Sequence, residues 1–257
     1  MKFSKISRRR FLRAALFGTP ALLLADAFLL EPAWLKVRRV RLAQDKPAHR
    51  FIQFTDLHHK GDHKYLKSVV RRINALSPEF VCFTGDIVEE AQHLAEALEI
   101  LQGTKSPLFG VPGNHDYWSN ADFGLIDKAF RTTGGRWLLD EQVVLADKAL
   151  TISGGTCNHA PKLKPNPRTK NILLIHYPEY ADRFGEAQFD VILAGHSHGG
   201  QVRIPFFGPL MVPYGCGRYD LGLFETAAGP LYVNAGIGFF YIDVRFNCRP
   251  ELTVVEI

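Results

Sequence analysis

The chain has 257 residues, 46% of them hydrophobic and 22% charged, a globular composition that excludes a long disordered or low-complexity protein. Its net charge of +5 is confined to the N-terminus, because from Arg50 onward 20 Lys and Arg stand against 23 Asp and Glu. A folded part with this acidic balance is not expected to bind nucleic acid.

The N-terminal segment combines a basic cluster with an apolar stretch. Residues 7–13 read Ser-Arg-Arg-Arg-Phe-Leu-Arg, and residues 14–30 are apolar except for Asp26. The pattern resembles a twin-arginine export signal and implies the twin-arginine export machinery as a partner. Three alternatives are open for this segment. Residues 25–27 would suit a small-residue cleavage site, whereas an apolar run that continues to Leu35 would suit an uncleaved anchor. The third alternative is an amphipathic helix of the domain.

A second basic cluster follows this segment. Lys36, Arg38, Arg39 and Arg41 suit either a solvated linker or contact with anionic lipid headgroups. We therefore expect a signal or membrane anchor at residues 1–35, a basic linker at 36–49 and one domain at 50–257. The expected location is the cell membrane, either at the exported or periplasmic face or peripheral to the inner membrane.

The domain alternates short apolar runs with helical periods. Strands are predicted at 51–55, 80–84 and 108–111, with helices at 63–76 and 91–101 between them. Further strands are predicted at 150–153, 171–175, 191–194, 230–234 and 252–257. The alternation indicates an α/β fold with a largely parallel sheet, in which ligands bind at the carboxyl ends of the strands.

Polar clusters stand where these strands end. They are Asp56-x-His58, Gly85-Asp86, Gly113-Asn114-His115-Asp116, His176 and Gly195-His196-x-His198. Singly, each has a structural explanation: Asp56 suits a turn, and His176 suits a hydrogen-bonded core histidine. Together, so many polar groups at one sheet edge need a compensating charge, which divalent metal supplies. Carboxylate, amide and imidazole ligands suit Mn, Fe or Zn, and seven of them suit two ions that share a bridging carboxylate.

The ordered series of motifs resembles the signature of calcineurin-like metallophosphoesterases. The resemblance implies a β-sandwich flanked by helices, with the metal site at the carboxyl ends of the strands. It implies one ion held by Asp56, His58, Asp86 and His198, and a second held by Asp86, Asn114, His176 and His196. His115 would contact the phosphate or the leaving group, and Asp116 would orient its ring. His59, next to His58, would face solvent or substrate.

The segments 195–205 and 247–251, with the twin-arginine start, resemble a bacterial subgroup. That subgroup contains membrane-associated phosphodiesterases and UDP-2,3-diacylglucosamine pyrophosphatases of lipid A synthesis. It implies hydrolysis of a phosphodiester or pyrophosphate bond in a lipid-linked or nucleotide-linked envelope substrate. The apolar segment 204–214 fits acyl chains or a membrane, or else a buried connector. A general phosphodiesterase, an envelope nuclease and a non-catalytic metal-binding scaffold remain the alternatives.

Overall fold

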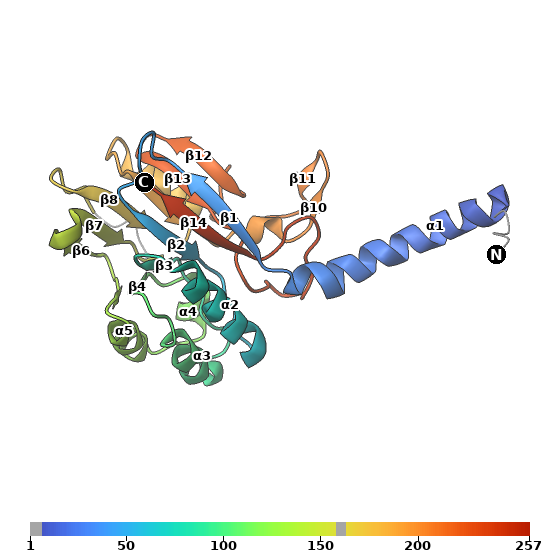
Figure 1. Ribbon diagram of the computed structural model, residues 1–257, viewed down its shortest axis with the longest axis horizontal. Coiled ribbons are helices and arrows are strands. Elements are labelled where there is room, and N and C mark those ends of the chain that lie inside the picture. The colour runs from blue at the N-terminus through green and yellow to red at the C-terminus, as the bar shows by residue number, and fades with distance from the viewer. Residues whose placement is uncertain (1–6, 158–162) are drawn as a thin grey trace.

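Two six-stranded sheets stack face to face in the computed structural model, which describes residues 7–157 and 163–257 (Figure 1). The first sheet contains, in spatial order, β1 (Lys36–Arg41), β14 (Glu251–Glu256), β2 (Arg50–Phe54), β3 (Val81–Phe83), β4 (Leu108–Gly110) and β5 (Arg136–Trp137). The second contains β12 (Gly222–Thr226), β13 (Gly229–Val233), β9 (Val191–Ala194), β8 (Lys170–Leu174), β7 (Leu150–Gly154) and β6 (Glu141–Leu145). β10 (Arg203–Ile204) and β11 (Gly208–Pro209) form a separate hairpin.

Both sheets are mixed rather than all parallel. β2 to β5 run parallel, as do β7, β8, β9 and β13, whereas β6 and β12 pair antiparallel at the edges of the second sheet. β14, from the end of the chain, inserts between β1 and β2, parallel to the first and antiparallel to the second. The strand ends that carry the polar motifs therefore meet at one edge of the sandwich, as in other parallel arrangements.

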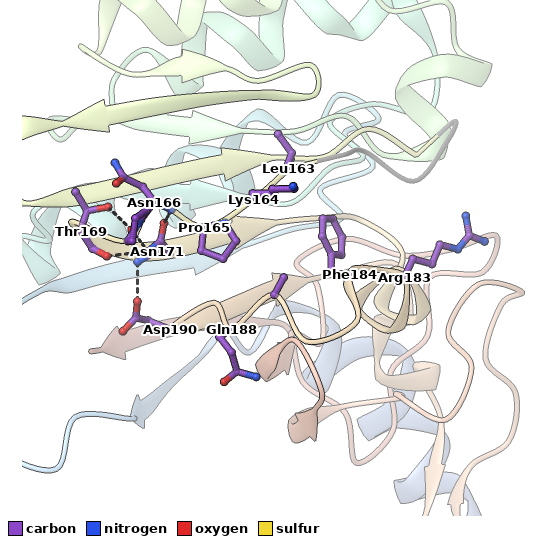
Figure 2. Close-up of a pocket in the computed structure, with 12 residues that line it drawn as sticks. Leu163, Lys164, Pro165, Asn166, Thr169, Asn171, Arg183, Phe184, Gln188 and Asp190 are labelled. Carbon is purple, nitrogen blue, oxygen red and sulfur yellow. Dashed lines mark hydrogen bonds between the residues drawn. The ribbon is translucent and has the colours of Figure 1, made fainter.

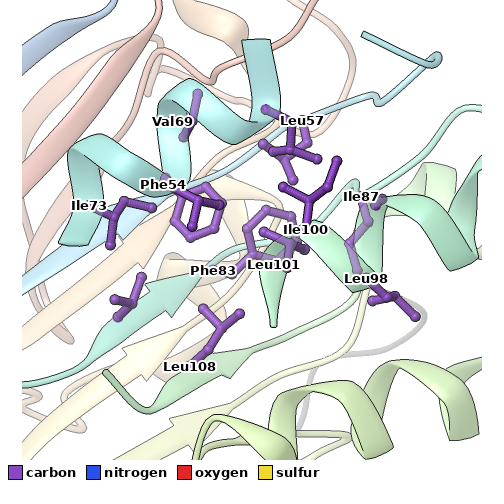
Figure 3. Packing of buried hydrophobic residues seen from close by; sticks show 14 of the residues in the cluster. Phe54, Leu57, Val69, Ile73, Phe83, Ile87, Leu98, Ile100, Leu101 and Leu108 are labelled. Carbon is purple, nitrogen blue, oxygen red and sulfur yellow. The ribbon is translucent and has the colours of Figure 1, made fainter. Parts of the chain in front are cut away.

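Three helices cover the outer face of the first sheet: α2 (His63–Leu76), α3 (Leu94–Leu101) and α5 (Phe123–Thr132). Figure 3 shows Val69 and Ile73 of α2 and Leu98 and Leu101 of α3 in one apolar cluster with the strand residue Phe83. A second apolar cluster fills the space between the two sheets, and a third lies under the short helix η5 (Pro178–Phe184). The central strands of each sheet are thus buried on both faces, which explains why they read as continuous apolar runs.

The helix predicted at 63–76 has those bounds, because its ends carry clear signals. The Asp62 side chain accepts a hydrogen bond from Tyr65 N at 3.0 Å, and Ser77 ends the helix in the left-handed conformation. The helix predicted at 91–101 is divided into the 3₁₀ turn η3 (Ala91–His93) and α3. The predicted strands are present with each bound shifted by at most one residue, as expected for the ends of elements.

The basic segment expected to be a linker instead begins with a strand. Residues 36–41 form β1, which pairs parallel with β14 along its whole length. Val37 and Val40 pack against the two apolar clusters on opposite faces of the sheet, and Arg38 Nε lies 2.9 Å from Glu251 Oε2. The charged side chains mask a strand whose partner is more than 200 residues away, so local sequence pattern does not reveal it.

The N-terminal helix α1 (Arg8–Ala25) projects away from the sandwich, and the residues after it attach to the domain (Figure 1). A π-helical turn, η1 (Asp26–Leu30), leads into η2 (Glu31–Ala33). Arg245 N donates to Ala27 O at 2.9 Å, and Cys248 N donates to Glu31 Oε2 at 3.1 Å. Among the described residues, no helix has both the length and the apolarity needed to cross a membrane.

Candidate metal centre

The first group of donor atoms follows β2 and β9. Asp56 and His58 come after β2, and His198 comes after β9. The Nε2 atoms of His58 and His198 are 3.0 Å apart, and Asp56 Oδ1 lies 3.6 Å from His198 Nε2 and 3.9 Å from His58 Nε2. All three side chains are buried. Ligands that sit about 2 Å from one ion are separated by distances of this order.

The second group follows β4, β8 and β9. Asn114 Oδ1 lies 3.0 Å from His176 Nε2, which lies 3.1 Å from His196 Nδ1. These side chains are buried as well. His176 and His196 therefore belong to a second cluster and do not join the first.

Asp86, at the end of the third strand, faces both groups. Its Oδ2 lies 3.5 Å from His58 Nε2 and 3.2 Å from His176 Nε2, while its Oδ1 accepts a hydrogen bond from His115 N at 2.8 Å. Oδ1 is thus held by the backbone, and Oδ2 is free to serve both groups. The structure brings together all seven residues predicted as ligands: Asp56, His58, Asp86, Asn114, His176, His196 and His198.

The protonation pattern of the second group fits a cation. His176 Nδ1 faces the carbonyl of Thr84 at 2.7 Å, and His196 Nε2 faces the carbonyl of Tyr214 at 2.6 Å. A carbonyl only accepts, so these nitrogens carry protons. The other ring nitrogen of His176, Nε2, faces both His196 Nδ1 and Asn114 Oδ1. This space therefore needs positive charge, either from a second proton on His176 or from a bound cation.

The electrostatics of the group are consistent with this need. Burial by itself lowers the pKa of His176, but the carboxylate of Asp86 outweighs burial and raises that pKa to about 9. Burial and the nearby His176 lower the pKa of His196 to about 3. The carboxyl of Asp86, also buried, is held ionised by His176, which lowers its pKa far below the usual range. The pocket therefore favours positive charge beside Asp86.

The backbone around the ligands is strained in a consistent way. Asp56, His58, Asp86, His196 and His198 all have φ between 43° and 68°, a region that residues other than glycine rarely adopt. Such conformations persist where the surrounding structure enforces them, and they are concentrated at functional sites.

The glycine before Asn114 is required by close packing. A Cβ on Gly113 would lie 2.1 Å from Asp86 Oδ1, the oxygen that the backbone holds. Gly195 is in the same position relative to Asp56: a Cβ there would lie 2.7 Å from Asp56 Oδ2. The Gly-Asn and Gly-His pairs in the sequence thus bring a ligand-bearing loop against a carboxylate.

His115 lies beside the donor groups but joins neither. Its ring contacts the ring of His58 edge-on, with centroids 4.7 Å apart, and its Nδ1 lies 2.8 Å from Glu89 Oε2. Burial opposes a charge on His115, but the hydrogen bond to Glu89 outweighs burial and raises the pKa. Nε2 of His115 is buried without a hydrogen-bond partner. This is the arrangement of an imidazole that holds a proton for another molecule.

Glu89 is a site residue that the sequence analysis missed. Its Oε1 lies 2.7 Å from His58 Nδ1, so one carboxylate positions both His58 and His115. Burial alone raises the pKa of Glu89, but the hydrogen bonds from His115 and His58 lower it to about 2. Its position three residues after Asp86 was the only signal in the sequence.

Asp116 does not orient His115 as expected. Its carboxylate accepts backbone hydrogen bonds from Asp86 N and Gly113 N, both at 2.9 Å, and from Ile87 N at 2.8 Å. Asn114–Trp118 forms the short helix α4, and neighbouring residues on a helix point in different directions. Asp116 therefore fixes the turn that carries Asp86, and Glu89 contacts the His115 ring.

An apolar cavity of about 760 Å³ opens directly beside the ligands. His196, His198 and Asn114 form its polar end. Apolar side chains line the rest: Trp118, Val202, Leu210, Met211, Val212, Phe240 and Ile242. The site thus joins a strongly polar centre to an apolar chamber large enough for a drug-sized or acylated molecule.

A second cavity, of about 920 Å³, lies among Leu163, Asn166, Arg183 and Asp190, without any ligand of the centre (Figure 2). Several of its polar groups bond to one another. Asn171 N donates to Asp190 Oδ2 at 2.7 Å, and Asn166 N donates to Asn171 Oδ1 at 2.7 Å. These bonds hold the turn before β8, so the cavity has a structural explanation.

The family model of calcineurin-like phosphoesterases matches residues 49–200, which contain all seven ligands, Glu89, His115 and Asp116. The chain belongs to this family. This metallophosphoesterase is 29% identical to the phosphodiesterase YaeI of Escherichia coli over 98% of the chain and 99% of that protein. It is 29% identical to an uncharacterized metallophosphoesterase, YkuE, of Bacillus subtilis, with 97% of each covered.

A third relative is named as a pyrophosphatase. The UDP-2,3-diacylglucosamine pyrophosphatase LpxG of Chlamydia trachomatis is 27% identical, with 94% of each chain covered. Among solved structures, TT1561 of Thermus thermophilus matches with a TM-score of 0.50 at 12% identity, over 74% of this chain and 90% of that one. This likeness supports the sandwich fold. As a family member, the protein is a hydrolase of phosphate esters that uses divalent metal.

Proposed function

We propose that this metallophosphoesterase uses two divalent ions to hydrolyse a phosphodiester or pyrophosphate bond in an amphiphilic, lipid-linked substrate at a membrane surface. The observation that carries the proposal is the position of Asp86 Oδ2 between His58 Nε2 and His176 Nε2, next to an apolar cavity. A single carboxylate oxygen that faces two donor groups is suited to a bridging ligand, and Mn, Fe or Zn suits these donors.

The residues divide the catalytic work. When bound, the two metal ions would neutralise the charge of the phosphate and supply a hydroxide near neutral pH. Glu89 fixes the His115 ring through Nδ1. His115 Nε2 is then directed at the departing oxygen or at the transition-state charge, where it donates its proton. No side chain of this chain has to form a covalent bond with phosphorus.

The substrate class follows from the cavity beside the ligands. An inorganic phosphate or a simple nucleotide would leave its apolar wall exposed to water, at a cost of about 25 cal/mol per Å². An acyl chain covers that wall while the phosphoester reaches the ligands. The relative that hydrolyses UDP-2,3-diacylglucosamine supports an acylated, nucleotide-linked substrate.

The proposed location is supported by exposed apolar side chains on the β10–β11 hairpin and on two segments that line the cavity. At the tip of the β10–β11 hairpin, Phe206 is fully exposed and Phe207 is 88% exposed. Met211, which follows the hairpin, is 71% exposed. Tyr241 and Ile242 in the neighbouring loop are also exposed. We call these five residues the apolar rim. The hairpin and α1 project from the same end of the sandwich in Figure 1. A bilayer there would receive the rim and deliver acyl chains to the cavity.

The substrate assignment is tested with three substrates in the presence of Mn²⁺: UDP-2,3-diacylglucosamine, a small aryl phosphodiester and single-stranded DNA. Met211→Glu places a charge in the cavity, so we expect KM for the acylated substrate to rise about tenfold or more while the small diester is unaffected. Leu223→Glu, exposed on β12, is the matched control and should change neither.

Equal effects of Met211→Glu on the acylated and small substrates would contradict a role for the cavity in acyl binding. Preferential cleavage of DNA would favour the nuclease alternative. Absence of turnover on all three, with metal bound, would favour a non-catalytic scaffold.

A further inference from the structure

A second group of histidines lies outside the metal centre, between the β2–α2 loop and the start of α3. His59 Nε2 lies 2.5 Å from Glu96 Oε1, and His63 Nε2, at the first residue of α2, lies 3.0 Å from the same oxygen. The ring of His93 in η3 is 6.1 Å from the ring of His59, centroid to centroid. Two imidazoles thus contact one carboxylate and a third ring lies beside them, although these residues are separated in the sequence.

The group is partly open to solvent. His59 is only 5% exposed, whereas the side chains of Glu96 and His63 are 27% and 53% exposed. The hydrogen bond from His59 lowers the pKa of Glu96, so this carboxylate is ionised. The buried His59 would be a fixed ligand. The more exposed Glu96 and His63 would leave an ion a path from solvent to it.

The chemistry of the donors selects the class of ligand. Two imidazole nitrogens directed at one carboxylate oxygen form a mixed nitrogen and oxygen set without a thiolate. Such sets bind borderline divalent ions, Zn²⁺ above all, with water in the remaining position. The two imidazole nitrogens approach the carboxylate oxygen from different sides, so the half-exposed His63 ring would have to turn inward for one ion to replace the two N–H···O hydrogen bonds.

We propose that His59, His63 and Glu96, with His93 as the nearest further donor, bind one Zn²⁺-like cation at a site separate from the metal centre. The bound ion would tie α2 to α3. It would also brace the catalytic loops, because His59 N donates to Ile87 O at 2.9 Å and His59 pairs with Val88. His59 is next to the ligand His58, and Ile87 is next to Asp86, so the ion would stiffen both loops at once.

The test compares zinc content in full-length protein. Wild type and the double variant His63→Gln/Glu96→Gln are equilibrated with excess Zn²⁺, passed over a desalting column and measured by elemental analysis. We expect the double variant to hold one zinc fewer per chain and to remain active on the small phosphodiester. His49→Gln is the matched control, because it removes another His–Glu pair, 3.2 Å from Glu79, and should retain the full content.

Equal zinc content in the double variant and the wild type would overturn the proposal. The single exposed variant Glu96→Gln repeats the measurement if the double variant melts early. The result does not depend on how many ions the centre holds, since only a difference is measured. The same comparison can be made in a background in which Asp86→Asn disrupts the metal centre. If adding His63→Gln to this variant removes one further zinc per chain, the site is supported even if the proposed function fails.

Discussion

At the scale of single residues, the role of His115 follows from what its two nitrogens contact. Nδ1 is held by Glu89, and Nε2 is left without a partner beside the donor groups. We expect His115→Gln to keep the metal content of wild type while kcat falls by about 10²–10⁴, the usual effect of losing a positioned acid or electrostatic stabiliser. Elemental analysis with kinetics measures both. Metal lost in parallel with rate would make His115 a ligand and contradict the assignment.

Glu89 acts through other residues, so its removal has a milder signature. Glu89→Gln keeps the side-chain length but loses the charge that positions His58 and His115. We expect kcat to fall by about 10–100-fold, in the range seen when a residue behind a ligand is changed. Glu90→Gln, at the exposed neighbouring position, should change little. A wild-type rate for Glu89→Gln would show that neither histidine needs this contact.

At the scale of elements, the segment after α1 is part of the domain, although the sequence favours a removable one. Glu31 is 9% exposed and accepts a hydrogen bond from Cys248 N. Deleting residues 1–25 should leave stability unchanged, whereas deleting 1–35 should lower the free energy of unfolding by about 1.5–3 kcal/mol or more, because a hydrogen bond to a buried charge is lost. Urea unfolding measures this. Equal midpoints for the two truncations would show that residues 26–35 contribute nothing.

The β10–β11 hairpin is the element that we expect to contact lipid. In the protein lacking residues 1–25, Phe206→Ser/Phe207→Ser should reduce flotation with phosphatidylglycerol-containing vesicles, and high salt should not reproduce the effect, since the contact is apolar. Val144→Ser, exposed on β6, serves as the control. Unchanged flotation of the hairpin variant would place the membrane contact elsewhere.

At the scale of the whole molecule, local pattern predicted what lies on single strands and missed what depends on pairing. The seven ligands were found because each motif directly follows an apolar strand. β1 was not found, because its basic residues hide a strand that pairs with the far end of the chain. Nor was Arg245, which is fully buried and donates to the carbonyls of Ala235, Gly236, Gly238 and Cys248. Only the folded chain gives that cation its partners.

The roles within one motif were also beyond the sequence. His115 and Asp116 are adjacent, which suggested a pair, but the turn of α4 separates their side chains and directs Asp116 toward backbone amides. The contact to His115 comes from Glu89, in a different loop. Residue type and spacing indicate which chemistry is present, whereas the direction of each side chain depends on local helix geometry.

The most direct test of a two-ion centre bridged by Asp86 is the metal content and phosphodiesterase rate of Asp86→Asn protein beside wild type. Asp127→Asn, which removes a surface ion pair with Arg131, is the control for a lost carboxylate. We predict two ions at the centre of wild type, substantial metal loss in Asp86→Asn, and activity near background. Full retention of both ions and of the wild-type rate in Asp86→Asn would contradict the account.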